Sequence, residues 1–179
     1  MKWLSDYITE FGIDGYRVDT VKHTEEDVWQ DFKSVCDAAF AEFKANNLEK
    51  VVDDNDFYLV GEIYNYGISG GKYFDFGNKK VNYFDDKFIS QINFEFKWNA
   101  AQNSYEEMFS RYSNILNDEL DGFGILNYVS SHDDGQPFDA MRKKPFESAT
   151  KLLLSPGAAQ IYYGDESARI LVVEGTNGD

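Results

Sequence analysis

Five short apolar runs recur along the chain, and a helical pattern or a long segment separates each one from the next. They begin near residues 15, 57, 92, 125 and 160 and have the length of β-strands. The third is predicted from the alternation of Ile92, Phe94 and Phe96, and the fifth spans residues 160–163. Strands that alternate with helices are typical of βαβ units, whose strands run parallel. The sequence therefore predicts an α/β fold built on a parallel sheet.

Helical patterns occupy most of the segments between these strands. Predicted helices cover residues 2–11, about 24–45, about 104–116 and 145–154. Thr24 followed by Asp27, and Ser104 followed by Glu107, are N-cap patterns. Residues 63–88 have no regular period and are rich in glycine and aromatic residues. We expect this segment to be a long loop that forms part of a binding cleft.

Four of the five predicted strands run into acidic residues. These are Asp19, Glu62, Asp133 and Asp165. In parallel α/β folds the carboxyl ends of the strands meet at one edge of the sheet, and active sites form there. One such acid is ordinary, but four at the same edge predict a catalytic site.

Two of these carboxylates have different surroundings. Arg17 and Asp19 point to the same side of a strand, about 7 Å apart at their Cα atoms, so the guanidinium holds the carboxylate ionised and orients it as a nucleophile requires. A purely structural ion pair is the alternative. Glu62 has no cation adjacent in sequence, and burial would favour its protonated form. An ionised and a protonated carboxyl group suit glycoside hydrolysis, and His132 would donate to a sugar hydroxyl.

Other chemistries fit the sequence less well. Two histidines on separate strands and the absence of a His-Glu-x-x-His helix weaken metal-dependent hydrolysis, and there is no Gly-x-Ser-x-Gly motif of a serine hydrolase. The acidic loop at 53–56 lacks the spacing of a calcium loop, and Gly71-Lys72 lacks that of a phosphate loop. The net charge of −15 argues against nucleic acid as a partner. No apolar run is long enough to span a membrane, and we recognise no signal peptide.

Taken together, the motifs resemble those of the alpha-amylase family of retaining glycoside hydrolases. The resemblance rests on Gly-Tyr-Arg-Val-Asp-Thr-Val-Lys-His at residues 15–23, Gly-Glu at 61–62, His-Asp at 132–133 and Tyr-Tyr-Gly-Asp-Glu at 162–166. It implies a parallel (β/α) TIM barrel that is incomplete here, with about five of its eight strands. Residues 1–179 would be the C-terminal portion of the catalytic (β/α)8 barrel, from the third helix to just past the eighth strand. The first three strands, the inserted domain and the C-terminal β domain would be absent.

The resemblance also implies a role for each residue of these motifs. Asp19 would be the nucleophile, Glu62 the general acid/base and Asp133 the stabiliser of the transition state. The expected substrate-binding residues are Arg17, Lys22, His23, Tyr64 and His132. The His23 carbonyl would also bind a structural calcium ion, most of whose ligands would lie in the absent part. Ser131 departs from the family pattern, which usually has Asn before the His-Asp pair.

The expected reaction is hydrolysis of α-1,4-glucosidic bonds in starch or maltooligosaccharides by a retaining double displacement. An α-glucan transglycosylase or an α-glucosidase of the same family would share all three acids. A non-catalytic carbohydrate-binding relative is the contrasting alternative, but binding alone does not require an acid/base pair. The resemblance makes an extracellular or periplasmic location possible. We expect the 179-residue chain to be inactive on its own and to self-associate.

Overall fold

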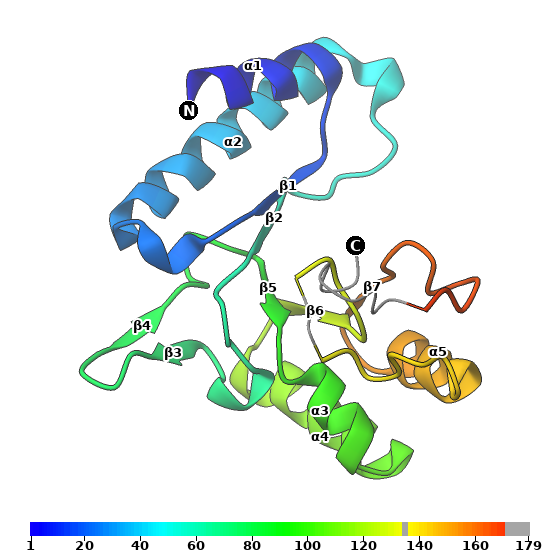
Figure 1. The fold of residues 1–179 in the computed structure, drawn as a ribbon. Helices are drawn as coiled ribbons and strands as arrows, with labels where there is room; N and C mark the ends of the chain where they lie inside the picture. Colours follow the sequence, from blue (N-terminus) through cyan, green and yellow to red (C-terminus); the bar gives the residue numbers. More distant parts are fainter. Residues whose placement is uncertain (134–135, 171–179) are drawn as a thin grey trace.

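The computed structural model describes residues 1–133 and 136–170. Its centre is a parallel sheet of five strands that lie side by side in their order along the chain, as predicted (Figure 1). The strands are β1 (Gly15–Val18), β2 (Tyr58–Gly61), β5 (Ser90–Asn93), β6 (Gly124–Tyr128) and β7 (Ala158–Gln160). This sequential order is that of a TIM barrel opened between two of its strands.

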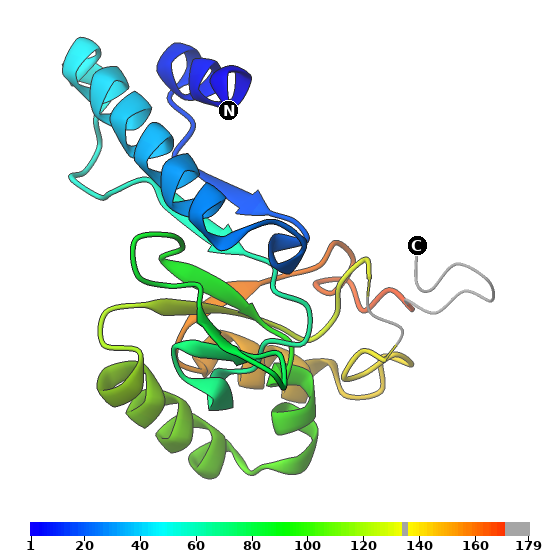
Figure 2. The same ribbon diagram turned by 90° about the vertical axis from the view of Figure 1, so that its left-hand side faces the viewer.

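Helices pack against the sheet at both ends. The helices are α1 (Lys2–Phe11), α2 (Glu26–Asn46), α3 (Phe96–Gln102), α4 (Tyr105–Asn114) and α5 (Pro145–Leu154). Figure 2 shows α1 and α2 beside β1 and β2, and α3, α4 and α5 gathered at the other end of the sheet. Short helical turns occur at Val21–His23, Leu48–Lys50, Ile68–Gly70 and Ile115–Glu119. None of the helices in the described part of the chain is long and apolar enough to cross a membrane.

Two predicted strands have different ends in the structure. The third ends at Asn93, so the predicted extension to Phe96 is wrong: the Phe94 N–H donates to the Tyr66 carbonyl (2.8 Å), and Phe96 begins α3. The fifth begins at Ala158 and ends at Gln160. Residues 161–163 leave the sheet because the Tyr162 N–H donates to the Asp165 carboxylate in a turn.

The helix caps confirm one N-cap pattern and correct the other. Ser104 and Glu107 form a complete capping box at the start of α4, as predicted. Thr24 is not the N-cap of α2, because its N–H donates to the Val21 carbonyl and closes the preceding turn. Glu25 is the N-cap instead, without a side-chain hydrogen bond.

The segment 63–88 is more regular than predicted. It contains an antiparallel hairpin of β3 (Tyr73–Asp75) and β4 (Lys80–Asn82), which pairs with no strand of the central sheet. The stretch before the hairpin is tied to the strand β5 and its end. The Ile68 N–H donates to the Asn93 side chain, and the Ser69 hydroxyl donates to Glu95.

The two faces of the sheet are packed differently. The face toward the helices carries the large hydrophobic core, in which Leu59 and Ile125 of the strands meet Phe40 of α2 and Met108 of α4. The opposite face carries a small cluster. It consists of Val60, Ile92 and Tyr128, with Phe94 and Leu126 packed against it. This second face corresponds to the interior of a barrel, and the strand ends that adjoin it carry the predicted site.

Candidate active site

Asp19 and Glu62 follow the paired ends of two neighbouring strands. Val18 of β1 is opposite Gly61 of β2, so the next residue on each strand is one of the two acids. Three hydrogen bonds continue the connection beyond the strands. The Glu62 N–H donates to the Val18 carbonyl (2.8 Å), the Val21 N–H to the Glu62 carbonyl (3.0 Å), and the Thr20 N–H to Glu62 Oε2 (2.7 Å). The local fold therefore fixes both acids at one edge of the sheet.

Glu62 is buried, with 6% of its surface exposed. Its Oε2 accepts the Thr20 N–H, and Thr20 takes a left-handed backbone conformation (φ 51°). A protonated carboxyl group still accepts a hydrogen bond through one oxygen while it donates from the other. The contact with Thr20 therefore fixes the orientation of the Glu62 carboxyl group.

Asp19 has the opposite surroundings. Its side chain is 62% exposed and forms an ion pair with Arg17, as the sequence predicts. Together with Arg17, it lines an open, mostly apolar groove between β1, α1 and α2, where Trp29 and Phe32 form much of the wall. The structure thus places Asp19 beside the Glu62 cavity, and Arg17 lines both.

The cavity next to Glu62 brings four of the predicted residues together. It has a volume of about 110 Å³ and is lined by Arg17, Glu62, His132 and Asp133. Its remaining walls come from the inner face of the sheet and from the loop after β6. They are Ile92, Phe94, Tyr128, Ser131 and Gln160. Two carboxyl groups, a guanidinium and an imidazole therefore converge on one space at the carboxyl ends of parallel strands.

Lys22 and Tyr64 lie against each other at the rim of this site. The Lys22 ammonium donates to the Tyr64 carbonyl (3.1 Å) and lies 5.0 Å from the centre of the Tyr64 ring. The Tyr64 ring in turn meets Phe94 edge to face, at 5.5 Å between ring centres. Two predicted substrate-binding residues therefore form one wall with a residue of the Glu62 cavity.

His23 lies one turn away from this wall. It is exposed, at the end of the short helix Val21–His23, and is not among the residues that line the Glu62 cavity. Within residues 1–133 and 136–170, no group of three or more His, Cys, Asp or Glu side chains is placed to hold a metal ion. The described side chains therefore do not form a calcium site by themselves, and the role of the His23 carbonyl stays a prediction.

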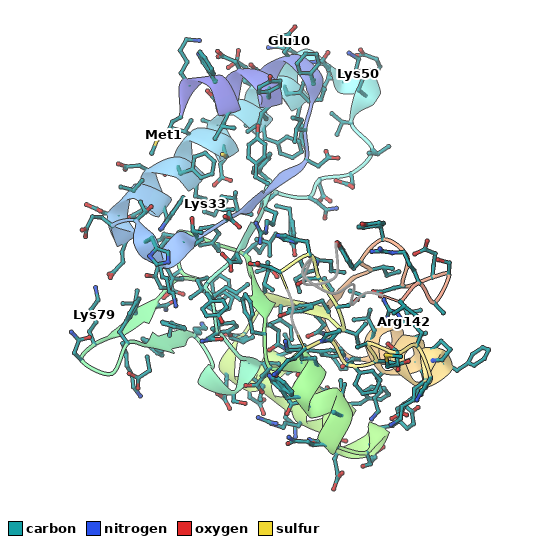
Figure 3. All side chains as sticks on the ribbon, viewed as in Figure 1. Met1, Glu10, Lys33, Lys50, Lys79 and Arg142 are labelled. Atoms are coloured by element: carbon teal, nitrogen blue, oxygen red, sulfur yellow. The ribbon has the colours of Figure 1, made fainter. Side chains whose placement is uncertain are left out.

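Asp165, the fourth acid at a strand end, forms structural contacts inside the fold. It forms a buried ion pair with Arg142, which lies beside α5 in Figure 3, and accepts a hydrogen bond from the Ser130 hydroxyl (2.6 Å). A carboxylate with these partners links the loop after β6 to the turn after β7. The sequence-based grouping of four acids in one site is therefore wrong for Asp165.

Several cavity residues were not predicted from the sequence. Phe94 and Tyr128 each follow an inward-facing residue by two positions, Ile92 and Leu126, so strand alternation could have identified them. Trp98 lines a neighbouring cavity from α3. No sequence signal pointed to it, because the predicted strand extended to Phe96 and left no helix there.

Known proteins resemble this chain in sequence and in fold. The chain is 37% identical to the periplasmic alpha-amylase of Escherichia coli (strain K12) over 169 residues, which are 93% of this chain and 23% of that protein. An alpha-amylase from Anoxybacillus superposes with a TM-score of 0.64 at 20% identity, over 98% of this chain and 38% of that one. A cyclic alpha-maltosyl-(1→6)-maltose hydrolase from Arthrobacter globiformis, in complex with maltose, gives 0.62 at 17% identity, over 98% and 37%.

These structural likenesses show the fold, and the sheet with its helices is an incomplete TIM barrel. No family model matches the chain. The chain spans less than a quarter of the length of the curated relative from Escherichia coli.

Proposed function

We propose that this chain, a segment of the alpha-amylase family, carries the catalytic residues of a retaining glycoside hydrolase that cleaves α-1,4-glucosidic bonds in starch or maltooligosaccharides. The observation that carries the proposal is the cavity at the carboxyl ends of the strands, where Arg17, Glu62, His132 and Asp133 converge beside the Arg17–Asp19 ion pair. Neither a structural ion pair nor a simple binding surface requires this combination of groups.

In the proposed reaction, Asp19 attacks the anomeric carbon while Glu62 protonates the oxygen of the leaving sugar. The ion pair with Arg17 keeps Asp19 charged and aims it, and the Thr20 N–H holds one oxygen of Glu62 so that the other carries the proton. Water then attacks the glycosyl-enzyme intermediate, and Glu62 takes the proton from that water. The configuration at the anomeric carbon is retained because it is inverted twice.

Three further groups complete this proposal. Asp133 stabilises the positive charge that develops on the sugar ring, and His132 donates to a sugar hydroxyl. Lys22 and His23 contact the sugar on the leaving-group side, and Tyr64 stacks on it. The packing of Lys22 against Tyr64 supports this shared function.

A retaining mechanism sets a geometric requirement. In a sugar-bound structure of the complete barrel, the carboxyl groups of Asp19 and Glu62 should lie about 5–5.5 Å apart. A separation of about 9 Å would instead indicate an inverting enzyme, with room for a water molecule between the general base and the sugar. This measurement tests the mechanism separately from the choice of substrate.

The transglycosylase and α-glucosidase alternatives share the three acids and differ in the acceptor or in the length of the substrate. Incubation of a protein that contains the complete barrel with starch distinguishes them. A rise in reducing ends indicates hydrolysis, longer oligosaccharides without such a rise indicate transfer, and release of glucose alone indicates an α-glucosidase. Binding of starch without any product would contradict an enzyme and favour the non-catalytic alternative.

We also propose the wider setting of this segment. It corresponds to the C-terminal portion of a (β/α)8 barrel, and its location is outside the cytoplasm, which the periplasmic relative supports. Calcium would bind through the His23 carbonyl together with ligands from outside residues 1–179, and it would stabilise the loop after β1. Starch activity before and after treatment with a chelator tests the proposed calcium site.

A further inference from the structure

A second cavity, of about 240 Å³, opens beside the cavity that Glu62 lines. The two cavities share three lining residues: Phe94, Tyr128 and Asp133. The two cavities therefore adjoin at Asp133, so a ligand longer than one sugar ring that lies against Asp133 is within reach of both.

The walls of the second cavity combine aromatic rings with polar side chains. In addition to the shared residues, they are Tyr64, Asn65, Lys97, Trp98 and Gln136. Aromatic faces suit the apolar C–H face of a pyranose ring, whereas amide, ammonium and carboxylate groups suit its hydroxyls. The volume is below the roughly 300–1,000 Å³ of pockets for drug-sized ligands, which fits a single sugar ring.

Trp98 is the more exposed of the two large apolar side chains of α3. The helix packs into the core through Phe96 and Ala100, which are fully buried, whereas Trp98 is 45% exposed. The Lys97 ammonium lies over the Trp98 ring, 4.9 Å from its centre, and also lines the cavity. A cationic hydrogen-bond donor therefore lies beside this ring. The core does not require an aromatic side chain at position 98, but a carbohydrate site does.

Tyr64 and Phe94, which also line this cavity, are held in place by the fold. Tyr64 packs against Phe94, and the Phe94 N–H donates to the Tyr66 carbonyl (2.8 Å). The Ile68 N–H is bound by the Asn93 side chain (3.1 Å), which anchors the end of the same loop to β5. The cavity is therefore formed by elements in the middle of the sheet, away from the edge strands β1 and β7.

We propose that Trp98 and Lys97 bind one glucosyl unit of an α-glucan, next to the units held at Glu62 and Asp133. The nature of the sugar rests on the proposed function. Trp98 stacks on the face of the ring, and Lys97 donates to its hydroxyls. The affinity for an oligosaccharide then increases when it becomes long enough to reach Trp98.

The test compares the binding of maltose and of maltoheptaose to the 179-residue chain by isothermal titration calorimetry. Trp98→Ala should weaken the binding of maltoheptaose roughly 3- to 10-fold, as expected for loss of one aromatic contact, and change that of maltose less. Trp98→Phe should restore part of the loss. Trp3→Ala is the matched control, because Trp3 is 82% exposed on α1 and is not among the residues of either cavity.

Equal affinities of the wild type and Trp98→Ala for maltoheptaose, with unchanged circular dichroism, would overturn the proposal. Failure of the wild-type chain to bind maltoheptaose would overturn it as well. The starch assay on a complete barrel keeps the two proposals distinct. Starch cleavage with no effect of Trp98 rejects only the Trp98 site, whereas an effect of Trp98 without starch cleavage rejects only the hydrolase.

Discussion

β5, in the middle of the sheet, and β1, at one edge, place their residues in opposite surroundings. All four residues of β5 are buried, and none of the four residues of β1 is. The proposed catalytic acids follow the same division, since Glu62 extends from the buried strand β2 and Asp19 from the edge strand β1. The middle of the sheet supplies stability, and the edge supplies an accessible carboxylate.

This difference has a physical basis. A general acid needs a dry environment that favours its protonated form, whereas a nucleophile needs a cation beside it that keeps it charged. Glu62 is buried and accepts the Thr20 N–H, whereas Asp19 is exposed beside the Arg17 guanidinium. Mutations at the edge should therefore change activity more than folding, and mutations in the middle should change folding first.

The largest effect is expected on turnover, from a substitution at the end of the edge strand β1. In a starch-degrading protein that contains these residues, Asp19→Asn should lower kcat by a factor on the order of 10⁴ or more, because the amide cannot form the covalent intermediate. Oligosaccharide affinity and the unfolding midpoint should change little, since the Asp19 side chain is mostly exposed. Kinetics on starch and a thermal melt measure both effects.

Asp14→Asn is the matched control, because Asp14 is an exposed acid that directly precedes β1, at the opposite end of the strand. It should leave kcat unchanged. Loss of folding in Asp19→Asn would identify the Arg17–Asp19 pair as structural and would contradict its role as the nucleophile.

The second largest effect is expected on stability, from a substitution in the middle of the sheet. Asn93 is fully buried, accepts the Ile68 N–H, and donates to the Tyr112 hydroxyl and to the Asn127 side chain. Asn93→Ala leaves the Ile68 N–H and the Asn127 side-chain oxygen buried without these hydrogen bonds, while the Tyr112 hydroxyl keeps the one from Asn99. The free energy of unfolding should therefore fall by about 3 kcal/mol. Urea denaturation followed by circular dichroism measures the change.

Gln160→Ala provides the comparison at the other edge, because Gln160 is a half-buried amide residue at the end of β7. It should cost less than about 0.5 kcal/mol. Equal losses at positions 93 and 160 would show that the edge contributes as much to stability as the middle does.

The positions of the five strands could be predicted from the sequence because each is a compact apolar run between helical patterns. The ends of the third and fifth strands could not, because a local contact decided each one. The alternation through Phe94 to Phe96 looks like strand, but Glu95 and Phe96 begin a helix. The hairpin β3–β4 was not predicted because each of its strands is only three residues long.

Most of the candidate site could be predicted from acids at strand ends. The structure brings Glu62, His132 and Asp133 to one cavity, whereas Asp19 lines the groove beside it. Asp165 was misassigned because its partner Arg142 lies 23 residues away, with no sequence period that relates the two. A carboxylate at a strand end is therefore a poor candidate for catalysis when it is enclosed in a buried ion pair, as Asp165 is, whereas the Arg17–Asp19 pair is exposed.

A smaller effect is expected on association of the isolated chain. The groove along β1 has a volume of about 390 Å³ and apolar walls that include Leu4 of α1 and Trp29 of α2. An open strand edge beside apolar surface favours pairing with another chain, so purified 1–179 should form dimers or larger species. Leu4→Lys should weaken this association roughly tenfold, which sedimentation velocity at several concentrations measures.

Val52→Lys is its control, because Val52 is an exposed apolar residue outside the groove and its substitution changes the net charge equally. A monomeric, starch-degrading 1–179 chain would contradict the expectation that the open edges and the absent strands matter.

The smallest effect concerns the pH dependence of stability near the edge. Cys36 lies fully buried on α2, and burial, followed by the charge of Asp37, raises the pKa of its thiol from 9.0 to about 11. The thiol of the unfolded chain loses its proton at lower pH, so its contribution to stability is complete below about pH 9 and is lost as the pH rises toward 11. The loss should be on the order of 1 kcal/mol, and urea titrations at pH 8, 9, 10 and 11 measure it.

The slope is the decrease of the free energy of unfolding per pH unit between pH 9 and pH 11. Cys36→Ala should reduce this slope without abolishing it, because burial also raises the pKa values of Tyr83 and Tyr112 to about 12. The wild type and Cys36→Ala are compared by their slopes and not by their absolute stabilities, since loss of a buried side chain lowers the free energy of unfolding at every pH. An unchanged slope would mean that water reaches α2 through the open groove beside β1. A reduced slope would show that water is excluded from the side of α2 that carries Cys36 and faces the core.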